Sequence, residues 1–227
     1  MKCCISTFYK YCRLLGFTGN ARYKKSDHYH PIRTTKPNEL WCADVTIFKT
    51  KDNVKHYIHF LMDHFSKYII GYKVCKSSSG EAIKELLHSA YELHKPEKLQ
   101  FLTDGGSENV NTIVSNFINS PDVPIEHIIA QKDVVFSNSM VEALNKVIKH
   151  QFLFPQEITN GIRLRSILDE SVPIYNEIRP QMSLNGNTPE ESFHGIPSNF
   201  DTYKAGFVHQ KQLRRIENKK NRCKGCL

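Results

Sequence analysis

The order in which apolar runs follow one another along this chain limits the folds that it can adopt. Three runs with the composition of β-strands come first, separated by turn residues, at residues 40–48, 56–62 and 68–74. Runs with helical spacing then alternate with single short strands, with helices at 80–93 and 109–119 and strands at 98–103 and 125–129. Hairpins make neighbouring strands antiparallel, whereas strand–helix–strand units make them parallel. The sequence therefore predicts an α/β fold with a five-stranded mixed sheet flanked by helices.

The fourth predicted strand ends on a carboxylate. The stretch from Leu99 to Asn109 is a short apolar run that stops at Asp104, and a Gly-Gly pair and a helical pattern follow. A carboxylate at the carboxyl end of a buried strand, where glycine lets another backbone come close, suits a metal or phosphate site. The same pattern is also typical of an ordinary turn. Asp104 therefore needs partners elsewhere in the chain.

Two further carboxylates lie in the strand region. Asp44 is in the middle of the first apolar run, and burying its charge would require a cation, hydrogen bonds or a metal. The alternative is an edge strand on which Asp44 faces water. Asp63 precedes Ser66 in a predicted hairpin connection, and because Asp and Ser readily form local hydrogen bonds, we assign Asp63 to the turn.

A long helix is predicted from Ser137 or Ser139 to about residue 152, after a loop at 131–136. Its apolar stripe consists of Val141, Leu144, Ile148 and Phe152, while Glu142, Lys146 and Lys149 share another face. One interpretation of that face is structural, with a capping box between Ser139 and Glu142 and an ion pair between Glu142 and Lys146. The other is that Glu142 belongs to a site that it shares with Asp44 and Asp104.

The remaining segments carry weaker signals. Residues 5–15 predict an amphipathic helix capped by Ser6 or Thr7, and residues 20–37 a basic linker. A further helix is expected at about 163–177, and Thr188 can cap a helix that has Pro189 in its first turn. Residues 211–224 carry seven basic side chains and one acid, which indicates either a solvated helix face or a nucleic-acid contact.

Charge and cysteine content restrict the class of protein. Lys and Arg outnumber Asp and Glu by 31 to 23, a net charge of +8 that favours a polyanionic partner without proving one. The absence of a long apolar run argues against a membrane span or a signal peptide. The seven scattered cysteines predict reduced thiols in the cytoplasm. The lone Cys223 and Cys226 pair, even with Cys3, Cys4, Cys12, His28 and His30, has no zinc-site spacing, so we expect no zinc.

Five segments taken together resemble the catalytic core of retroviral integrases and bacterial insertion-sequence transposases, above all the IS3-type group. They are residues 37–46, 62–71, 103–109, 138–149 and 175–180, and the likeness runs from about residue 37 to 193. The resemblance implies a ribonuclease-H-like fold. It also implies that Asp44, Asp104 and Glu142 are the catalytic carboxylates of a DDE transposase that cleaves DNA strands and transfers them to a target.

Such chemistry needs hard oxygen ligands for two Mg²⁺ or Mn²⁺ ions. By resemblance, Asp44 would bridge the two ions, and Asp104 and Glu142 would each hold one. We expect Lys146 and Lys149 to contact DNA beside the ions, and Arg179 to extend this basic surface. The implied partners are element ends and target DNA, bound by a homo-oligomer in the bacterial cytoplasm.

The resemblance divides the chain into an N-terminal helix and basic linker (1–36), a catalytic core (37–200) and a basic tail (201–227). The first helix looks like the end of a helix-turn-helix segment that precedes the core in longer relatives. The sequence departs from the family pattern at Gln181, at Leu102 and Thr103, and at Ala143. Because of these departures, a core that binds DNA without cutting it remains the alternative function. A nuclease acting on RNA–DNA hybrids is disfavoured by the flanking motifs.

Overall fold

The computed structural model describes residues 4–17, 32–106, 109–120, 124–130, 139–198 and 200–220. Contacts divide the chain into two units, Met1–His30 and Pro31–Leu227. The described part of the first unit is helix α1, Ile5–Leu14, which follows Cys4 as its N-cap, so the predicted caps Ser6 and Thr7 are wrong. Most of the predicted linker, the loop at 131–136, and Cys3, His28, His30, Cys223 and Cys226 lie outside the described residues.

The second unit is built on the predicted five-stranded mixed sheet. Its strands are β1 (Leu40–Lys49), β2 (Lys55–Asp63), β3 (Ile69–Cys75), β4 (Leu99–Thr103) and β5 (Ile125–Ile129), in the order β3-β2-β1-β4-β5. β1 pairs antiparallel with β2, and β2 with β3, through the two hairpins. β1 pairs in parallel with β4, and β4 with β5. β1 is thus the central strand, and the edge-strand interpretation of Asp44 is wrong.

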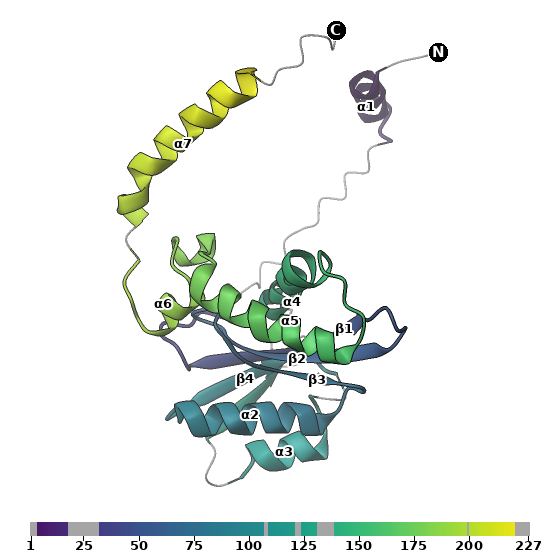
Figure 1. Cartoon of the computed structure of the whole chain (residues 1–227), viewed down its shortest axis with the longest axis vertical. Coiled ribbons are helices and arrows are strands. Elements are labelled where there is room, and N and C mark those ends of the chain that lie inside the picture. Colours follow the sequence, from purple (N-terminus) through teal and green to yellow (C-terminus); the bar gives the residue numbers. More distant parts are fainter. Residues whose placement is uncertain are drawn as a thin grey trace. The chain divides into compact units, whose positions relative to one another are not determined.

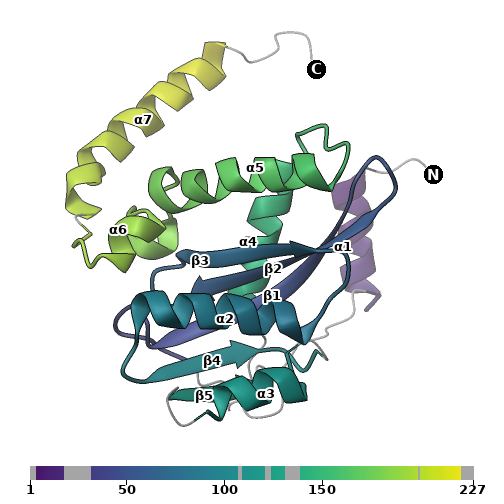
Figure 2. The same ribbon diagram turned by 60° about the horizontal axis from the view of Figure 1, so that its bottom comes forward.

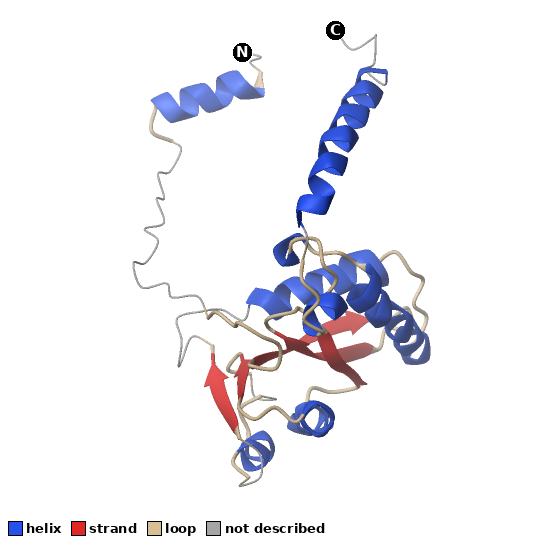
Figure 3. Cartoon of the chain, turned by 90° about the vertical axis from the view of Figure 1, so that its left-hand side faces the viewer, coloured by secondary structure: helices blue, strands red, loops and turns tan. Residues whose placement is uncertain are grey.

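Helices cover both faces of this sheet (Figures 1, 2 and 3). One face carries α2 (Gly80–His94) and α3 (Thr112–Ile118). The other carries α4 (Ser139–Val147), the π-helix η1 (Ile148–Leu153), α5 (Gly161–Pro173) and the π-helix η2 (Ile174–Ile178). Each helix buries an apolar stripe against the sheet, which is where most of its stability comes from.

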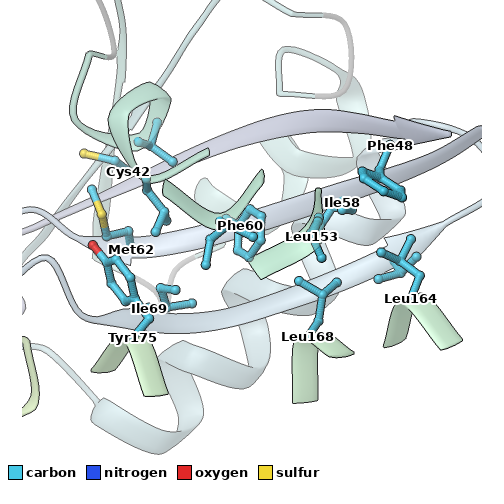
Figure 4. Close-up of a cluster of buried hydrophobic side chains, with 14 of the residues drawn as sticks. Cys42, Phe48, Ile58, Phe60, Met62, Ile69, Leu153, Leu164, Leu168 and Tyr175 are labelled. Carbon is cyan, nitrogen blue, oxygen red and sulfur yellow. The ribbon is translucent and has the colours of Figure 1, made fainter. Parts of the chain in front are cut away.

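Strand alternation sorts the buried side chains into two clusters. Trp41 and Ala43 of β1 pack with α2 and α3, whereas Cys42 packs with α4 and α5. Figure 4 shows the second cluster, in which Phe60 and Met62 of β2 lie among side chains of the helices. Because successive side chains of a strand point to opposite faces, Asp44 projects from the same face as Cys42, toward α4.

The long helix differs from its prediction in its winding. A single α-helix was expected to about residue 152, but α4 ends at Val147 and the chain continues as η1. Val147 has helical dihedral angles (φ −60°, ψ −51°), so the helical path is continuous. Ser139 is the first residue of α4, and residue 138, where a cap would stand, lies outside the described residues.

Polar contacts hold η2 and the residues that follow it in place. Asn176 in η2 accepts a hydrogen bond from the Ile69 N–H (2.9 Å) and donates one to the Ile69 carbonyl (3.0 Å), which attaches η2 to β3. After the short 3₁₀ helix η3 (Met182–Leu184), Thr188 caps α6 (Pro189–Phe193) in a capping box with Glu191. Helix α7 covers Phe200–Lys220. In the described part of the chain, no helix is both long and apolar enough to cross a membrane.

Candidate active site

The parallel pairing of β1 and β4 brings two of the predicted site residues to one face of the sheet. Cys42 is the register partner of Leu102. Asp44 lies two residues beyond Cys42, and Asp104 two residues beyond Leu102 and directly after the end of β4. Side chains two apart share a face, so both carboxylates start from the face that α4 covers.

Asp44 is a partly buried carboxylate with two hydrogen-bond donors. Its Oδ1 accepts from the Val45 N–H (2.9 Å), and its Oδ2 from Nδ2 of Asn145 in α4 (2.7 Å). Burial raises the pKa of Asp44 to about 6, and the negative charges of Asp104 and Glu142 add to this rise, while the two hydrogen bonds oppose it. Asp44 is therefore close enough to both Asp104 and Glu142 for their negative charges to act on it.

Asp104 is held by the turn that follows β4. Its Oδ1 accepts from the Gly106 N–H (3.1 Å) and from Nδ2 of Asn109 (2.7 Å). Asn109 is only 1% exposed, so the second donor reaches Asp104 from the protein interior. The close backbone approach expected at the glycines is not required at Gly105, because a Cβ there would meet Ile129 Cγ2 at an ordinary 4.0 Å.

The first two turns of α4 and the start of η1 supply the remaining charged groups. Glu142 and Lys146 are exposed, Asn145 is buried, and Lys149 is partly buried. Burial lowers the pKa of Lys149, and the charge of Asp44 opposes this shift, so Lys149 lies near the carboxylates. The ion pairs found among the described residues do not include one between Glu142 and Lys146, so the ion pair of the structural interpretation is not formed.

The chemistry of this donor set fits a divalent cation. Three carboxylates are the hard oxygen ligands that Mg²⁺ and Mn²⁺ prefer, and a cation would relieve their mutual repulsion. The three carboxylates do not surround a common point in this structure. Among the described residues, no three His, Cys, Asp or Glu side chains are arranged so that they could hold a metal ion.

Asp63, by contrast, makes the predicted hydrogen bonds with Ser66 in its turn and one further bond outside the turn. Its Oδ2 accepts from both the N–H (2.8 Å) and the hydroxyl (2.6 Å) of Ser66. Its Oδ1 accepts from the Asn38 N–H at 2.8 Å, a partner that the sequence did not indicate. Asp63 pairs with Trp41 in the β1–β2 register, so it projects from the face opposite Asp44.

Two models of known protein families match the part of the chain that contains this site. Residues 34–132 and 125–189 each match a family described as Integrase core domain. Together the two matches cover more than half of the chain and include Asp44, Asp104 and Glu142. The chain belongs to the integrase core family.

Several relatives of this integrase core come from bacterial insertion sequences. It is 25% identical over 161 residues to the candidate transposase InsK for insertion sequence element IS150 of Escherichia coli strain K12, covering 70% of this chain and 56% of that protein. It is 22% identical over 162 residues to the transposase for insertion sequence element IS904 of Lactococcus lactis, covering 70% and 63% respectively. The chain thus spans just over half of the length of the first relative and somewhat less than two thirds of the second.

Solved structures show the same fold. The HTLV-2 integrase catalytic core domain, determined in complex with magnesium, superposes with a TM-score of 0.56 at 21% identity over 71% of this chain and all of that one. A chain of the simian T-cell lymphotropic virus intasome gives a TM-score of 0.61 at 19% identity over 73% of this chain and 57% of that chain. The integrase core described here therefore has the ribonuclease-H-like fold.

The structure places Arg179 on another flank of α4. Its Nε donates to Gln151 Oε1 at 3.0 Å, and its guanidinium lies 5.8 Å from the centre of the Tyr175 ring. It lines a cavity of about 470 Å³ together with Ala143 and Val147. At about 100° per residue, these two positions lie roughly 100–140° around the helix from Glu142. Arg179 therefore lies beside the Ala143 and Val147 side of α4, and its expected contact with DNA stays a prediction.

Sequence reasoning missed the two amides that orient the carboxylates. No role was predicted for Asn145. It falls on the apolar stripe, four residues after Val141 and three before Ile148. A polar side chain on a buried stripe is the signal that could have identified it. Asn109 was noted only as the start of a helix, whereas α3 begins at Thr112. The Oδ1 atoms of both amides are buried and lack a hydrogen-bond partner among the described residues.

Proposed function

We propose that this integrase core catalyses metal-dependent DNA strand cleavage and strand transfer during transposition of an insertion sequence. The observation that carries the proposal is the position of Asp44, a half-buried carboxylate on the central strand whose pKa is raised to about 6 by burial and by the charges of Asp104 and Glu142. A fold gains nothing in stability from gathering three carboxylates in this way, so their proximity is better explained by function. The names of the bacterial relatives support the same conclusion.

Asp44, Asp104 and Glu142 would hold two Mg²⁺ or Mn²⁺ ions, which, when bound, supply Lewis acidity to the attacking and leaving oxygens. The rest of the site positions the ligands. The Asn145 amide donates a hydrogen bond to one oxygen of Asp44 and thereby fixes the orientation of the carboxylate. The Asn109 amide and the Gly106 N–H do the same for Asp104. Fixed ligands lose little entropy when a substrate binds, which favours catalysis.

Lys149 and Lys146 would guide the DNA. Lys149 lies close enough to Asp44 for their charges to interact, so its ammonium group can contact phosphates near the scissile bond. In the proposed sequence, a water oxygen attacks the scissile phosphorus and frees a 3′-hydroxyl. That hydroxyl then attacks a phosphorus of the target strand, which forms a new phosphodiester bond and breaks the target's own bond, so that the target's 3′-oxygen leaves as a 3′-hydroxyl. Element ends and target DNA are the proposed substrates, and a homo-oligomer would hold them together.

The test is Mn²⁺-dependent joining of a labelled element end to plasmid DNA by the full chain, with nicking of supercoiled plasmid as a second readout. We expect Asp104→Asn to abolish both reactions and to leave DNA affinity nearly unchanged, because affinity comes mainly from phosphate contacts. The matched control is Glu92→Gln, which removes an exposed carboxylate on α2. Wild-type rates in Asp104→Asn would overturn the proposal.

The alternative is a core that binds DNA without cutting it, motivated by the departures from the family pattern. The Gln181 departure lines a cavity with Arg179, and the lining of that cavity includes none of the three carboxylates. Thr103 Oγ1 is within 2.8 Å of His127 Nε2 and thus serves the β4–β5 pair. Metal-independent DNA binding with no nicking by the wild-type chain would establish this alternative.

A further inference from the structure

The C-terminal half of α7 is strongly basic. Residues 211–220 include five basic side chains, Lys211, Arg214, Arg215, Lys219 and Lys220, against the single acid Glu217. In residues 200–210, one lysine and one aspartate cancel. All side chains from residue 206 to 220 are exposed. The charge is thus concentrated on one segment of the helix and is open to a partner.

Three of these five charges share one side of the helix, whereas Lys219 lies about 80° and Lys220 about 180° from Lys211 around the axis. With about 100° per residue, Arg214 and Arg215 lie within roughly 60° of Lys211 around the helix axis. Leu213 and Ile216 lie on the opposite side, about 140–160° away from Lys211. We call Lys211, Arg214 and Arg215 the α7 basic stripe. It extends about 6 Å along the helix, and neighbouring phosphates of one DNA strand follow each other at about 3.4 Å along the duplex axis.

The free helix does not neutralise this stripe. Like charges three and four residues apart destabilise a helix, and Lys211 has this relation to both Arg214 and Arg215. The ion pairs found in the described part of the chain include none of the three side chains. An external polyanion would relieve the repulsion, whereas a second copy of the same helix would add to it.

We propose that the α7 basic stripe binds the phosphate backbone of duplex DNA, as a contact surface additional to the catalytic site. The inference rests on the proposed function only in taking DNA as the substrate. It assigns a sequence-independent role to the stripe, because backbone phosphates carry no base information. It also separates affinity from chemistry, since the stripe contributes to binding and the carboxylates to cleavage.

The test measures binding of the full chain to a labelled DNA duplex by fluorescence anisotropy, between about 50 and 200 mM salt. We expect the triple variant K211A/R214A/R215A to bind more weakly and to flatten the slope of log affinity against log salt by about 2–3 units. The charge-preserving variant R214K/R215K should keep the wild-type slope. The matched control L213A/I216A, on the opposite side of the helix, should keep both slope and affinity.

Three outcomes would overturn the proposal. These are an unchanged slope in the triple variant, an equal loss of affinity in L213A/I216A, and displacement of the duplex by single-stranded RNA at equal concentration. The second would indicate an apolar partner, and the third a preference for RNA. Mn²⁺-dependent nicking at saturating DNA distinguishes this inference from the proposed function. The triple variant should need more DNA to reach its maximal nicking rate, whereas Asp104→Asn should lose nicking at every DNA concentration and keep the wild-type slope.

Discussion

At the scale of single residues, Asp44 occupies a position that the fold alone would fill with an apolar side chain. Its strand neighbours Ala43 and Cys42 are almost completely buried. The carboxylate remains there because Asn145 and the Val45 N–H donate to it. Two hydrogen bonds do not offset burial near two other negative charges, which is why its pKa remains raised. The protein without bound metal is therefore less stable than its fold permits.

Replacing Asp44 by Asn should stabilise the metal-free protein. The asparagine keeps the shape of the side chain and removes the charge that Asp104 and Glu142 repel. A rise in pKa from 3.8 to about 6 corresponds to about 2–3 kcal/mol at neutral pH. We therefore expect the melting temperature in EDTA to increase by a few degrees while nicking is lost. A lower melting temperature would show that the repulsion is unimportant.

Replacing Asn145 by Ala should slow cleavage without weakening DNA binding. The variant removes the hydrogen bond that fixes Oδ2 of Asp44. Loss of a group that orients a metal ligand typically costs about 10–100-fold in activity or metal affinity. A higher Mn²⁺ concentration should recover part of the rate, which a simple folding defect would not allow. Asn116→Ala, at an exposed position of α3, is the control.

Whether the role of a residue could be predicted from the sequence depends on the kind of residue. Asp44 and Asp104 could be singled out because a charge inside or directly after an apolar strand needs a reason. Asp63 could be assigned to its turn from its spacing to Ser66. The direction of the Arg179 side chain could not be predicted. It depends on the π-helix η2, which ends directly before Arg179, and no periodicity in the sequence indicates that helix. The hydrogen bond from Asn145 to Asp44 joins segments about a hundred residues apart and likewise follows only from the tertiary structure.

At the scale of elements, α4 and η1 join the core to the site. Val141, Leu144 and Ile148 anchor them in the buried cluster, while Glu142 and the two lysines face outward or toward Asp44. The apolar period correctly predicted where this helix lies and which face is buried. It could not predict the change to π winding at Ile148, because a single wider turn leaves the apolar pattern nearly unchanged.

Lys146→Ala and Lys149→Ala should each flatten the salt dependence of DNA binding by about one unit, since each lost phosphate contact releases one fewer counterion. Lys149 should have the larger effect on nicking because of its proximity to Asp44. Anisotropy titrations with the folded variants provide the measurement. Slopes equal to wild type in both variants would make these side chains a solvated helix face.

Strand β2 contains a buried histidine that should make the fold sensitive to acid. His59 is fully buried, and neither ring nitrogen has a hydrogen-bond partner among the described residues. Burial, together with the charge of Lys73, lowers its pKa to about 4. The unfolded chain takes up this proton near pH 6.5, about its ordinary value. Stability associated with His59 is therefore complete above about pH 6.5 and is lost as the pH falls toward 4.

His59→Leu should remove this part of the pH dependence. Urea unfolding at about pH 7.5 and about pH 5 should show a smaller loss of free energy of unfolding on acidification than in wild type. His88→Leu, at an exposed position of α2, controls for the change of residue type. Equal losses in His59→Leu and wild type would show that His59 is protonated in the folded protein.

At the scale of the whole molecule, the two units should be separable. No described residue of the first unit belongs to either buried cluster, and α1 buries none of its own side chains. The chain lacking residues 1–30 should therefore unfold at the same temperature as the full chain when followed by circular dichroism. A decrease of several degrees would show that the first unit contributes to the core.

The parallel pairing of β1 with β4 also has a consequence while the protein is being synthesised. β2 can pair with one side of β1 almost at once, but the residues that pair with its other side lie about 60 positions downstream. At roughly 5–20 residues per second, the ribosome needs several seconds to make them. During that interval an apolar strand presents an open hydrogen-bonding edge, the arrangement most prone to aggregation. We expect the charge of Asp44, in the middle of this strand, to oppose pairing between nascent chains during that interval.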